Sequence, residues 1–265
     1  MNRSIALIGF GEAASTFARA AGWGAKACAW DIAPQQAEAM AQAGVSSTPD
    51  AASALSGAPL VLSLVTADQA LLVAQECAPY LAMGALWCDM NSVAPETKRA
   101  AARVIEAAGG RYVDVAVLAP VDPAEIRVPL LLAGEHADDA AAALAEAGFA
   151  NVRVVGSEVG RASAIKMIRS VMVKGIEALT DEMMLAADAA GVTADVLASL
   201  DASEKAVPWA QRAAYNLERM YAHGLRRAAE MEESALTLSA LGVEPVMTRG
   251  TVLRQRAAAG KGQAA

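Results

Sequence analysis

The sequence predicts an α/β protein in which a doubly wound, mostly parallel sheet is followed by an all-helical domain. Up to about residue 157, short apolar runs alternate with alanine-rich helical patterns. Beyond Gly160 these runs give way to Ala, Leu, Met, Glu and Arg at helical spacing. With 265 residues the chain is long enough for two domains. We expect these at residues 1–158 and 159–265.

Short apolar runs mark the expected strands. They are residues 5–8, 25–29, 60–65, 85–88, 112–117, 128–132 and 152–155. Helical patterns separate several of them, for example over residues 67–80 and 95–108. Strands that recur after helices need crossover connections, which predicts a mostly parallel sheet covered on both faces.

The helical domain is expected to open with one long helix from residue 161 to about residue 190. At ~1.5 Å per residue this helix would be about 45 Å long, and helices of this length usually link domains or subunits. We expect later breaks at Gly191, Pro208, Gly224 and Gly242. The wide apolar face of the long helix predicts a homodimer packed through the helical domain.

Charge and cysteine content restrict the partners and the compartment. The formal net charge of -7 argues against nucleic acid and anionic membranes, because clustered Lys and Arg supply phosphate binding. A small molecule is the expected partner. The three cysteines, Cys28, Cys77 and Cys88, lie in apolar segments and are expected to be reduced. We see no signal-peptide pattern and no membrane-length apolar run, so we expect a cytoplasmic protein.

A glycine-rich loop follows the first expected strand and opens a helix. Its six residues fit the pattern G-x-G-x-x-A and are the expected cofactor-binding loop: Gly9, Phe10, Gly11, Glu12, Ala13 and Ala14. In this context Gly9 permits a tight turn and Gly11 lets the backbone approach a pyrophosphate, while the small Ala14 allows close helix packing. The alternative is a purely structural turn.

An acidic residue stands at the expected end of the second strand. Asp31 follows the loop by about 20 residues, the spacing at which a carboxylate accepts hydrogen bonds from an adenosine ribose. The alternative interpretation is a helix-capping aspartate. A carboxylate here would repel the 2'-phosphate of NADP, and no Arg follows it, so NAD is the favoured cofactor and NADP the other candidate.

Three further motifs resemble those of the β-hydroxyacid dehydrogenase family, which includes 3-hydroxyisobutyrate and 6-phosphogluconate dehydrogenases. Residues 89–95 resemble its D-x-S-T-x-x-P turn, residues 64–66 resemble the strand end beneath the cofactor, and residues 160–166 resemble its G-x-A-x-x-x-K segment. The resemblance implies a Rossmann domain and a helical domain. It also implies cofactor contacts at Leu64, Val65, Thr66, Asn91 and Ser92, and it makes Lys166 the catalytic lysine.

The chain departs from that family at the substrate loop. Leu118, Ala119 and Pro120 stand where the family has Ser-Gly-Gly, and Ser170 replaces an Asn four residues after the lysine. Apolar side chains and a proline without an N–H lack donors for a substrate carboxylate. We therefore expect these loop residues to line a pocket for a non-standard substrate.

The long helix places polar residues on one side. Lys166, Ser170 and Lys174 fall within about 80° of one another, on a helix that is otherwise largely apolar. The simple alternative is a stripe that faces water. Alcohol oxidation needs a base for the hydroxyl proton, and a lysine whose pKa is lowered by burial and a neighbouring cation can serve. Lys166 is thus the expected acid/base, with Lys174 as that neighbour and Ser170 beside them.

These patterns together predict an NAD-dependent dehydrogenase that acts on a β-hydroxy acid or a related hydroxymethyl or carbonyl compound, without a metal. Two alternatives remain: an enzyme similar to imine reductases, and a nicotinamide-binding sensor that lacks catalysis. Lys166 argues against both.

Overall fold

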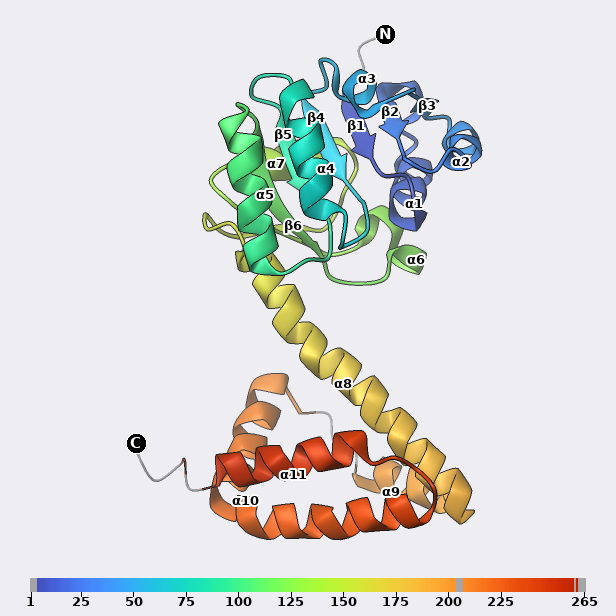
Figure 1. The fold of residues 1–265 in the computed structure, drawn as a ribbon, viewed down its shortest axis with the longest axis vertical. Helices are drawn as coiled ribbons and strands as arrows, with labels where there is room; N and C mark the ends of the chain where they lie inside the picture. The colour runs from blue at the N-terminus through green and yellow to red at the C-terminus, as the bar shows by residue number, and fades with distance from the viewer. Residues whose placement is uncertain (1–3, 204–206, 260, 262–265) are drawn as a thin grey trace. The chain divides into compact units, whose positions relative to one another are not determined.

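The computed structural model describes residues 4–203, 207–259 and 261, apart from some side chains of the two longest helices. The chain divides into two compact units, Met1–Arg169 and Ser170–Ala265. The division falls inside the long helix α8 (Arg161–Ala190), eleven residues after the predicted boundary at 158/159. Figure 1 shows α8 continuing from the first unit into the second.

Unit 1 is built on one sheet, which has eight strands within the described residues, in the order β3-β2-β1-β4-β5-β6-β7-β8. The strands are β1 (Ile5–Ile8), β2 (Ala27–Trp30), β3 (Ser46–Ser47), β4 (Leu60–Ser63), β5 (Leu86–Asp89), β6 (Arg111–Val117), β7 (Leu130–Ala133) and β8 (Val152–Gly156). Neighbours are parallel except β6 and β7, which are antiparallel. The predicted doubly wound, mostly parallel sheet is confirmed, while the two-residue β3 was not predicted because it is too short to form an apolar run.

Helices cover both faces of this sheet. Their bounds are α1 (Glu12–Ala21), α2 (Gln36–Gln42), α3 (Ala51–Leu55), α4 (Ala70–Cys77), α5 (Pro95–Ala107), α6 (Val121–Ala124) and α7 (Ala137–Glu146), with short 3-10 turns η1 (Gly24–Lys26), η2 (Ala78–Tyr80) and η3 (Glu125–Arg127). Residues of α1 and α7 pack on one face of the sheet and residues of α3, α4 and α5 on the other.

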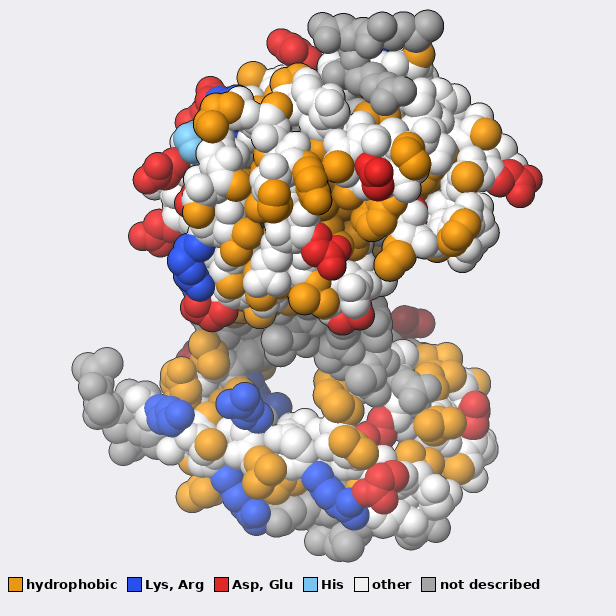
Figure 2. Space-filling view, turned by 45° about the horizontal axis from the view of Figure 1, so that its top comes forward, with side chains coloured by type: hydrophobic (Ala, Val, Ile, Leu, Met, Phe, Trp, Pro, Cys, Tyr) orange, Lys and Arg blue, Asp and Glu red, His pale blue; other side chains and the backbone are white. Residues whose placement is uncertain are grey.

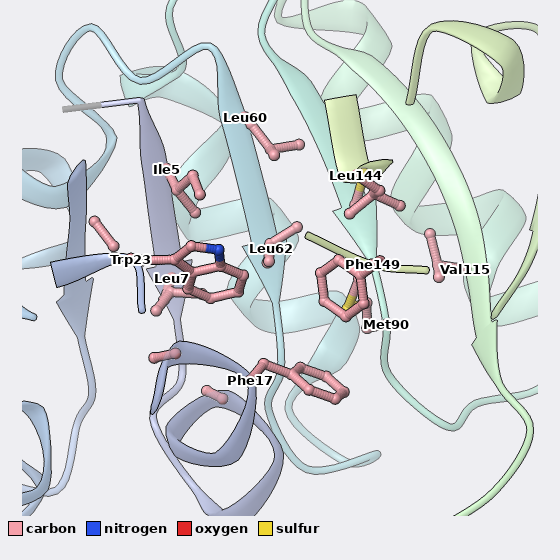
Figure 3. Packing of buried hydrophobic residues seen from close by; sticks show 14 of the residues in the cluster. Ile5, Leu7, Phe17, Trp23, Leu60, Leu62, Met90, Val115, Leu144 and Phe149 are labelled. Carbon is pink, nitrogen blue, oxygen red and sulfur yellow. The ribbon is translucent and has the colours of Figure 1, made fainter. Parts of the chain in front are cut away.

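Alternation along the strands produces these two cores. In β1, Ile5 and Leu7 enter one cluster, and Ala6 and Ile8 enter the other, because successive side chains point to opposite faces. Figure 3 shows Phe17 and Phe149 among the strand side chains of the first cluster. Their ring centroids lie 5.1 Å apart in an edge-to-face arrangement.

The strand order reverses between β1 and β4. In open α/β sheets the crevice outside the carboxyl ends of the strands at such a reversal is the usual ligand site. The loops that follow β1, β4 and β5 are therefore the place to look for function.

Within its described residues unit 2 contains helices and the turns between them but no strand, as predicted. Besides the second part of α8 it contains α9 (Thr193–Ser203), α10 (Trp209–Ala240) and α11 (Val246–Ala258). Figure 2 shows hydrophobic side chains on the surface of these helices between charged ones. Among the described residues, no helix combines the length and hydropathy needed to cross a bilayer.

One predicted helix end is wrong. Gly224 lies inside α10 and does not end it, although Gly191 and Gly242 do follow helices. A Cβ at Gly224 would come within 2.4 Å of the carbonyl oxygen of Gln255. The glycine therefore allows α10 and α11 to approach closely, and that contact compensates for its low helix propensity.

Candidate functional site

The glycine loop between β1 and α1 has the backbone that a pyrophosphate requires. Gly9 has φ 87°, and a Cβ there would lie 2.4 Å from the carbonyl oxygen of Leu64, so only glycine fits. A Cβ at Gly11 would meet nothing within 4 Å, which leaves open space against the backbone. Gly11 caps α1 without a side-chain hydrogen bond. The first N–H groups of α1 can therefore bind an anion, and the loop fits a dinucleotide cofactor.

Asp31 follows β2 and ties it to this loop. Its Oδ2 accepts from the Phe10 amide at 2.6 Å, and its Oδ1 accepts from the Ala33 amide at 2.8 Å. The side chains of Phe10 and Ala14 are fully buried in the core. Within the loop, Phe10 and Ala14 thus act through backbone and packing, whereas the Asp31 side chain lines the cavity described next.

A cavity of about 430 Å³ lies along the loop and the end of β4. Eight of the expected cofactor-binding residues line it: Gly9, Gly11, Glu12, Ala13, Asp31, Leu64, Val65 and Thr66. A neighbouring cavity of about 310 Å³ shares Glu12, Ala13 and Leu64 with it. The second cavity adds Met90, Ser92, Val117, Ala119, Pro120, Val121 and Lys166. The structure thus brings the loop, the strand ends and the expected catalytic lysine to two cavities that share lining residues.

Lys166 reaches the turn after β5. Its Nζ donates to Ser92 Oγ at 2.5 Å. The neighbouring Asn91 is buried and is not among the residues that line either cavity. Its Oδ1 accepts from the Val65 amide at 2.7 Å and its Nδ2 donates to Ser63 Oγ at 3.0 Å. Ser92 is thus the member of this pair that faces the cavity, and Asn91 joins the ends of β4 and β5.

The structure says less about Ser170 and Lys174, the other two polar residues expected on the same side of α8. Ser170 is half-buried, four residues after Lys166 and at the first position of unit 2. The Lys174 side chain lies outside the part of the chain that the structure describes. The roles expected for Ser170 and Lys174 therefore stay predictions.

The substrate loop has few free donors. The Leu118 amide donates to the Pro129 carbonyl at 3.0 Å, and Pro120 has no N–H. The Leu118 side chain packs with Ala116 and Leu131, while Ala119 and Pro120 line the second cavity. Arg169, on α8, donates through Nη1 to the Leu118 carbonyl at 3.3 Å.

Sequence reasoning missed a buried polar group behind the site. Lys98, Asp89, Asp114 and Tyr112 are each at most 1% exposed. Lys98 could have been found by its spacing, since it occupies the apolar face of α5 with Ala101, Ala102 and Ile105. A lysine at such a position must meet a charge partner.

The comparisons with known proteins agree with this geometry. Residues 4–156 match the family model described as the NAD binding domain of 6-phosphogluconate dehydrogenase. The chain belongs to this family. It is therefore an NAD(P)-binding member of an oxidoreductase family, and the resemblance drawn from its motifs is confirmed. Residues 187–258 match a domain of unknown function, DUF1932.

Solved structures extend the family likeness over the whole chain. A conserved hypothetical protein from Sinorhizobium meliloti 1021 is 39% identical, with 97% of this chain and 88% of that chain covered and a TM-score of 0.64. A conserved protein described as structurally similar to 3-hydroxyacid dehydrogenases is 31% identical, with 96% of both chains covered and a TM-score of 0.64. An imine reductase from Myxococcus stipitatus in complex with NADP+ shares the fold, at 19% identity, 96% and 93% coverage and a TM-score of 0.79.

Proposed function

We propose that this protein is an NAD-dependent dehydrogenase or reductase that acts on a β-hydroxy acid or a related hydroxymethyl or carbonyl compound. One observation carries the proposal. The Lys166 ammonium lies 2.5 Å from Ser92 Oγ, in a cavity that shares Glu12, Ala13 and Leu64 with the cavity of the glycine loop. An acid/base group and a dinucleotide loop thus line adjoining spaces.

Lys166 is the proton-transfer group of the proposed reaction. When bound, the nicotinamide cofactor supplies an acceptor or donor for hydride. In the oxidative direction the neutral Lys166 amine takes the proton of the substrate hydroxyl, while the carbinol carbon loses hydride and the carbonyl forms. In the reductive direction the Lys166 ammonium returns the proton to the oxygen. Ser92 Oγ orients Nζ and offers a second hydrogen bond to the substrate oxygen.

Asp31 supports the preference for NAD. Its carboxylate lines the loop cavity beside the exposed Ile32, and among the residues that the structure describes no Arg side chain lines that cavity. A 2'-phosphate placed there would meet a like charge. Ribose hydroxyls can instead donate to the carboxylate, because each of its oxygens can accept a further hydrogen bond.

The substrate loop favours a compound whose acid group, if it has one, lies away from residues 118–120. Arg169 stands three residues after Lys166 on α8 and contacts the Leu118 carbonyl through Nη1 only weakly, at 3.3 Å. A guanidinium has five N–H donors, so most of them are available to a carboxylate. We place the acid group of the substrate at Arg169.

Reduction of an imine is the second candidate. The likeness in fold to imine reductases favours it, including one from Streptomyces aurantiacus at 21% identity and a TM-score of 0.78. The Lys166 ammonium would then protonate the imine nitrogen as hydride reaches the carbon. A cofactor-binding sensor without turnover is the third candidate.

A substrate panel with two lysine variants tests the proposal. Absorbance of the reduced nicotinamide is followed with hydroxy acids, aldehydes and cyclic imines. We expect Lys166→Met to lower turnover by ~10² or more and to leave cofactor affinity nearly unchanged. Lys26→Met, at an exposed lysine in η1, is the matched control and should be silent. Turnover within a few-fold in Lys166→Met would exclude Lys166 as the acid/base, and cofactor binding without any turnover by the unmodified protein would favour the sensor.

A further inference from the structure

A buried ionic group lies between β5, β6 and α5. Lys98 Nζ donates to Asp89 Oδ1 at 2.9 Å and to the Asp89 carbonyl at 2.6 Å, and it lies 3.5 Å from Asp114 Oδ1. The Tyr112 hydroxyl donates to Asp89 Oδ2 at 2.7 Å. Burial and the neighbouring Asp89 carboxylate raise the pKa of Tyr112, so its hydroxyl remains a donor at neutral pH.

Stability alone is a weak reason for such a group. Taking charges out of water costs free energy, and well-packed apolar side chains of similar volume often serve as well or better. Two carboxylates share one ammonium here, which leaves a net negative charge inside the domain. Where buried ionic groups are kept, fixing one arrangement of the neighbouring segments is their best-attested use.

Each carboxylate holds the segment that carries one member of the Lys166–Ser92 pair. Asp89 Oδ1 accepts from the Asn91 amide at 2.9 Å and so fixes the turn that carries Ser92. Asp114 Oδ2 accepts from the amides of Gly160 at 3.1 Å and Ser163 at 3.0 Å. Gly160 directly precedes α8 and Ser163 lies in its first turn, about one turn before Lys166.

Lys98 is the cation that joins these two segments, the turn after β5 and the start of α8. It contacts both carboxylates, and it is fully buried, so it touches no substrate. We propose that Lys98 is a positioning residue that sets the Lys166–Ser92 contact by holding the turn after β5 against the first turn of α8. The proposal rests on the function proposed above, because it gives Lys166 its role.

Three variants separate positioning from folding. Lys98→Met removes the cation and leaves two buried carboxylates, which is strongly destabilising. Lys98→Met combined with Asp114→Asn restores the net charge, and the Asn side-chain oxygen can still accept from the α8 amides. Tyr112→Phe is the control, since it also loses a buried hydrogen bond at Asp89 but retains both contacts of Lys98 with carboxylates. Near-ultraviolet circular dichroism reports whether each variant is folded.

The decisive readout is the reactivity of Lys166 itself. Acetylation of Lys166 by acetic anhydride is measured by mass spectrometry between pH 6 and 10, in the full chain and without substrate. In the double variant we expect the midpoint of this profile to move by about half a pH unit or more, and kcat to fall roughly 10-fold to 100-fold with the cofactor KM little changed. In Tyr112→Phe the profile should match that of the unmodified protein.

The outcomes can be told apart. An unmoved Lys166 profile in a folded double variant overturns the positioning role, whatever the turnover. Failure of both Lys98 variants to fold also overturns it, because Lys98 would then serve the fold. If the unmodified protein turns over no substrate, the proposed function fails, and the acetylation profile still decides whether Lys98 positions Lys166.

Discussion

At the scale of single residues, Asp31 combines two tasks. It fixes the glycine loop through the Phe10 amide and the chain after β2 through the Ala33 amide. Its carboxylate also lines the loop cavity. The same side chain therefore shapes the cavity and places a carboxylate in its lining.

The cofactor preference should respond to that charge. In Asp31→Asn the size and one acceptor are kept while the negative charge is lost. We expect the ratio of the NADP and NAD dissociation constants to fall by about tenfold, since repulsion of the 2'-phosphate disappears and ribose binding weakens. Fluorescence titration with both reduced cofactors measures this, with the exposed Asp138→Asn as the control. An unmodified protein that already prefers NADP would show that Asp31 does not contact the ribose.

At the scale of elements, the loop over residues 118–120 should select the substrate. A carboxylate without donors loses about 1.5–3 kcal/mol per charged hydrogen bond, so 3-hydroxyisobutyrate should be used one to two orders of magnitude less efficiently than bulkier hydroxy compounds. Pro120→Gly, which adds an N–H, should reduce the difference in kcat/KM between 3-hydroxyisobutyrate and the bulkier compounds. Arg169→Ala should impair acid-bearing substrates, whereas Arg153→Ala on β8 should not. Comparison of kcat/KM over the panel checks this, and efficient use of the small acid by the unmodified protein would contradict it.

The junction of α8 with α11 depends on one buried carboxylate. Glu182 accepts from the Thr248 amide at 3.0 Å, the Thr248 hydroxyl at 2.6 Å and the Met247 amide at 2.8 Å. Burial by itself raises the pKa of Glu182, but these hydrogen bonds outweigh burial and lower it. Because the folded pKa lies below the unfolded one, this stabilisation is present above the ordinary glutamate pKa and is lost as pH falls through the folded value.

Glu182→Gln should therefore destabilise unit 2 at neutral pH by about 1.5–3 kcal/mol. It should also make the free energy of unfolding of unit 2 depend less on pH in the acid range. Amide hydrogen exchange in α11 between pH 3 and 7 provides the measurement. Glu244→Gln, at an exposed side chain in the same unit, is the matched control. An equal loss of protection in both variants would mean that the hydrogen bonds of Glu182 contribute nothing beyond its charge.

The elements also show which features a sequence can reveal. The glycine loop and the bounds of α8 follow from local patterns, and residues 161–190 form the helix as predicted. The helix end predicted at Gly224 was wrong because this glycine serves a close contact with the Gln255 carbonyl of another helix. Lys98 could have been found from its place on the apolar face of α5, but its partners could not, because Asp89 and Asp114 come from two different strands. Contacts within one helical turn appear as a regular spacing in the sequence. Contacts between distant segments produce no such pattern.

At the scale of the whole molecule, exposed apolar side chains predict an assembly. Large hydrophobic residues of unit 2 are exposed in the single chain, among them Leu185, Leu217, Leu225, Val246 and Leu253. Burial of such side chains in a partner would stabilise a dimer. The homodimer expected from the sequence is therefore retained as a prediction.

Sedimentation at micromolar concentration should find a dimer. Leu225→Glu and Leu253→Glu, at side chains 68% and 67% exposed, should shift the protein towards the monomer because a charge would be buried in the interface. Met83→Glu, at a side chain 85% exposed in unit 1, is the control and should not change the mass. A monomeric unmodified protein would refute the assembly.

The three cysteines make the molecule a convenient background for site-directed labelling. Cys28, Cys77 and Cys88 are all buried, and burial raises the pKa of Cys77 and of Cys88 to about 12. At pH 7 only about one thiol in 10⁵ would be ionised at such a pKa, and the thiolate is the species that reacts with maleimides. A cysteine introduced on the surface would thus take up a fluorophore or spin label without removal of the native ones. A pair of labels, one on each unit, could then report cofactor-dependent motion in the intact chain.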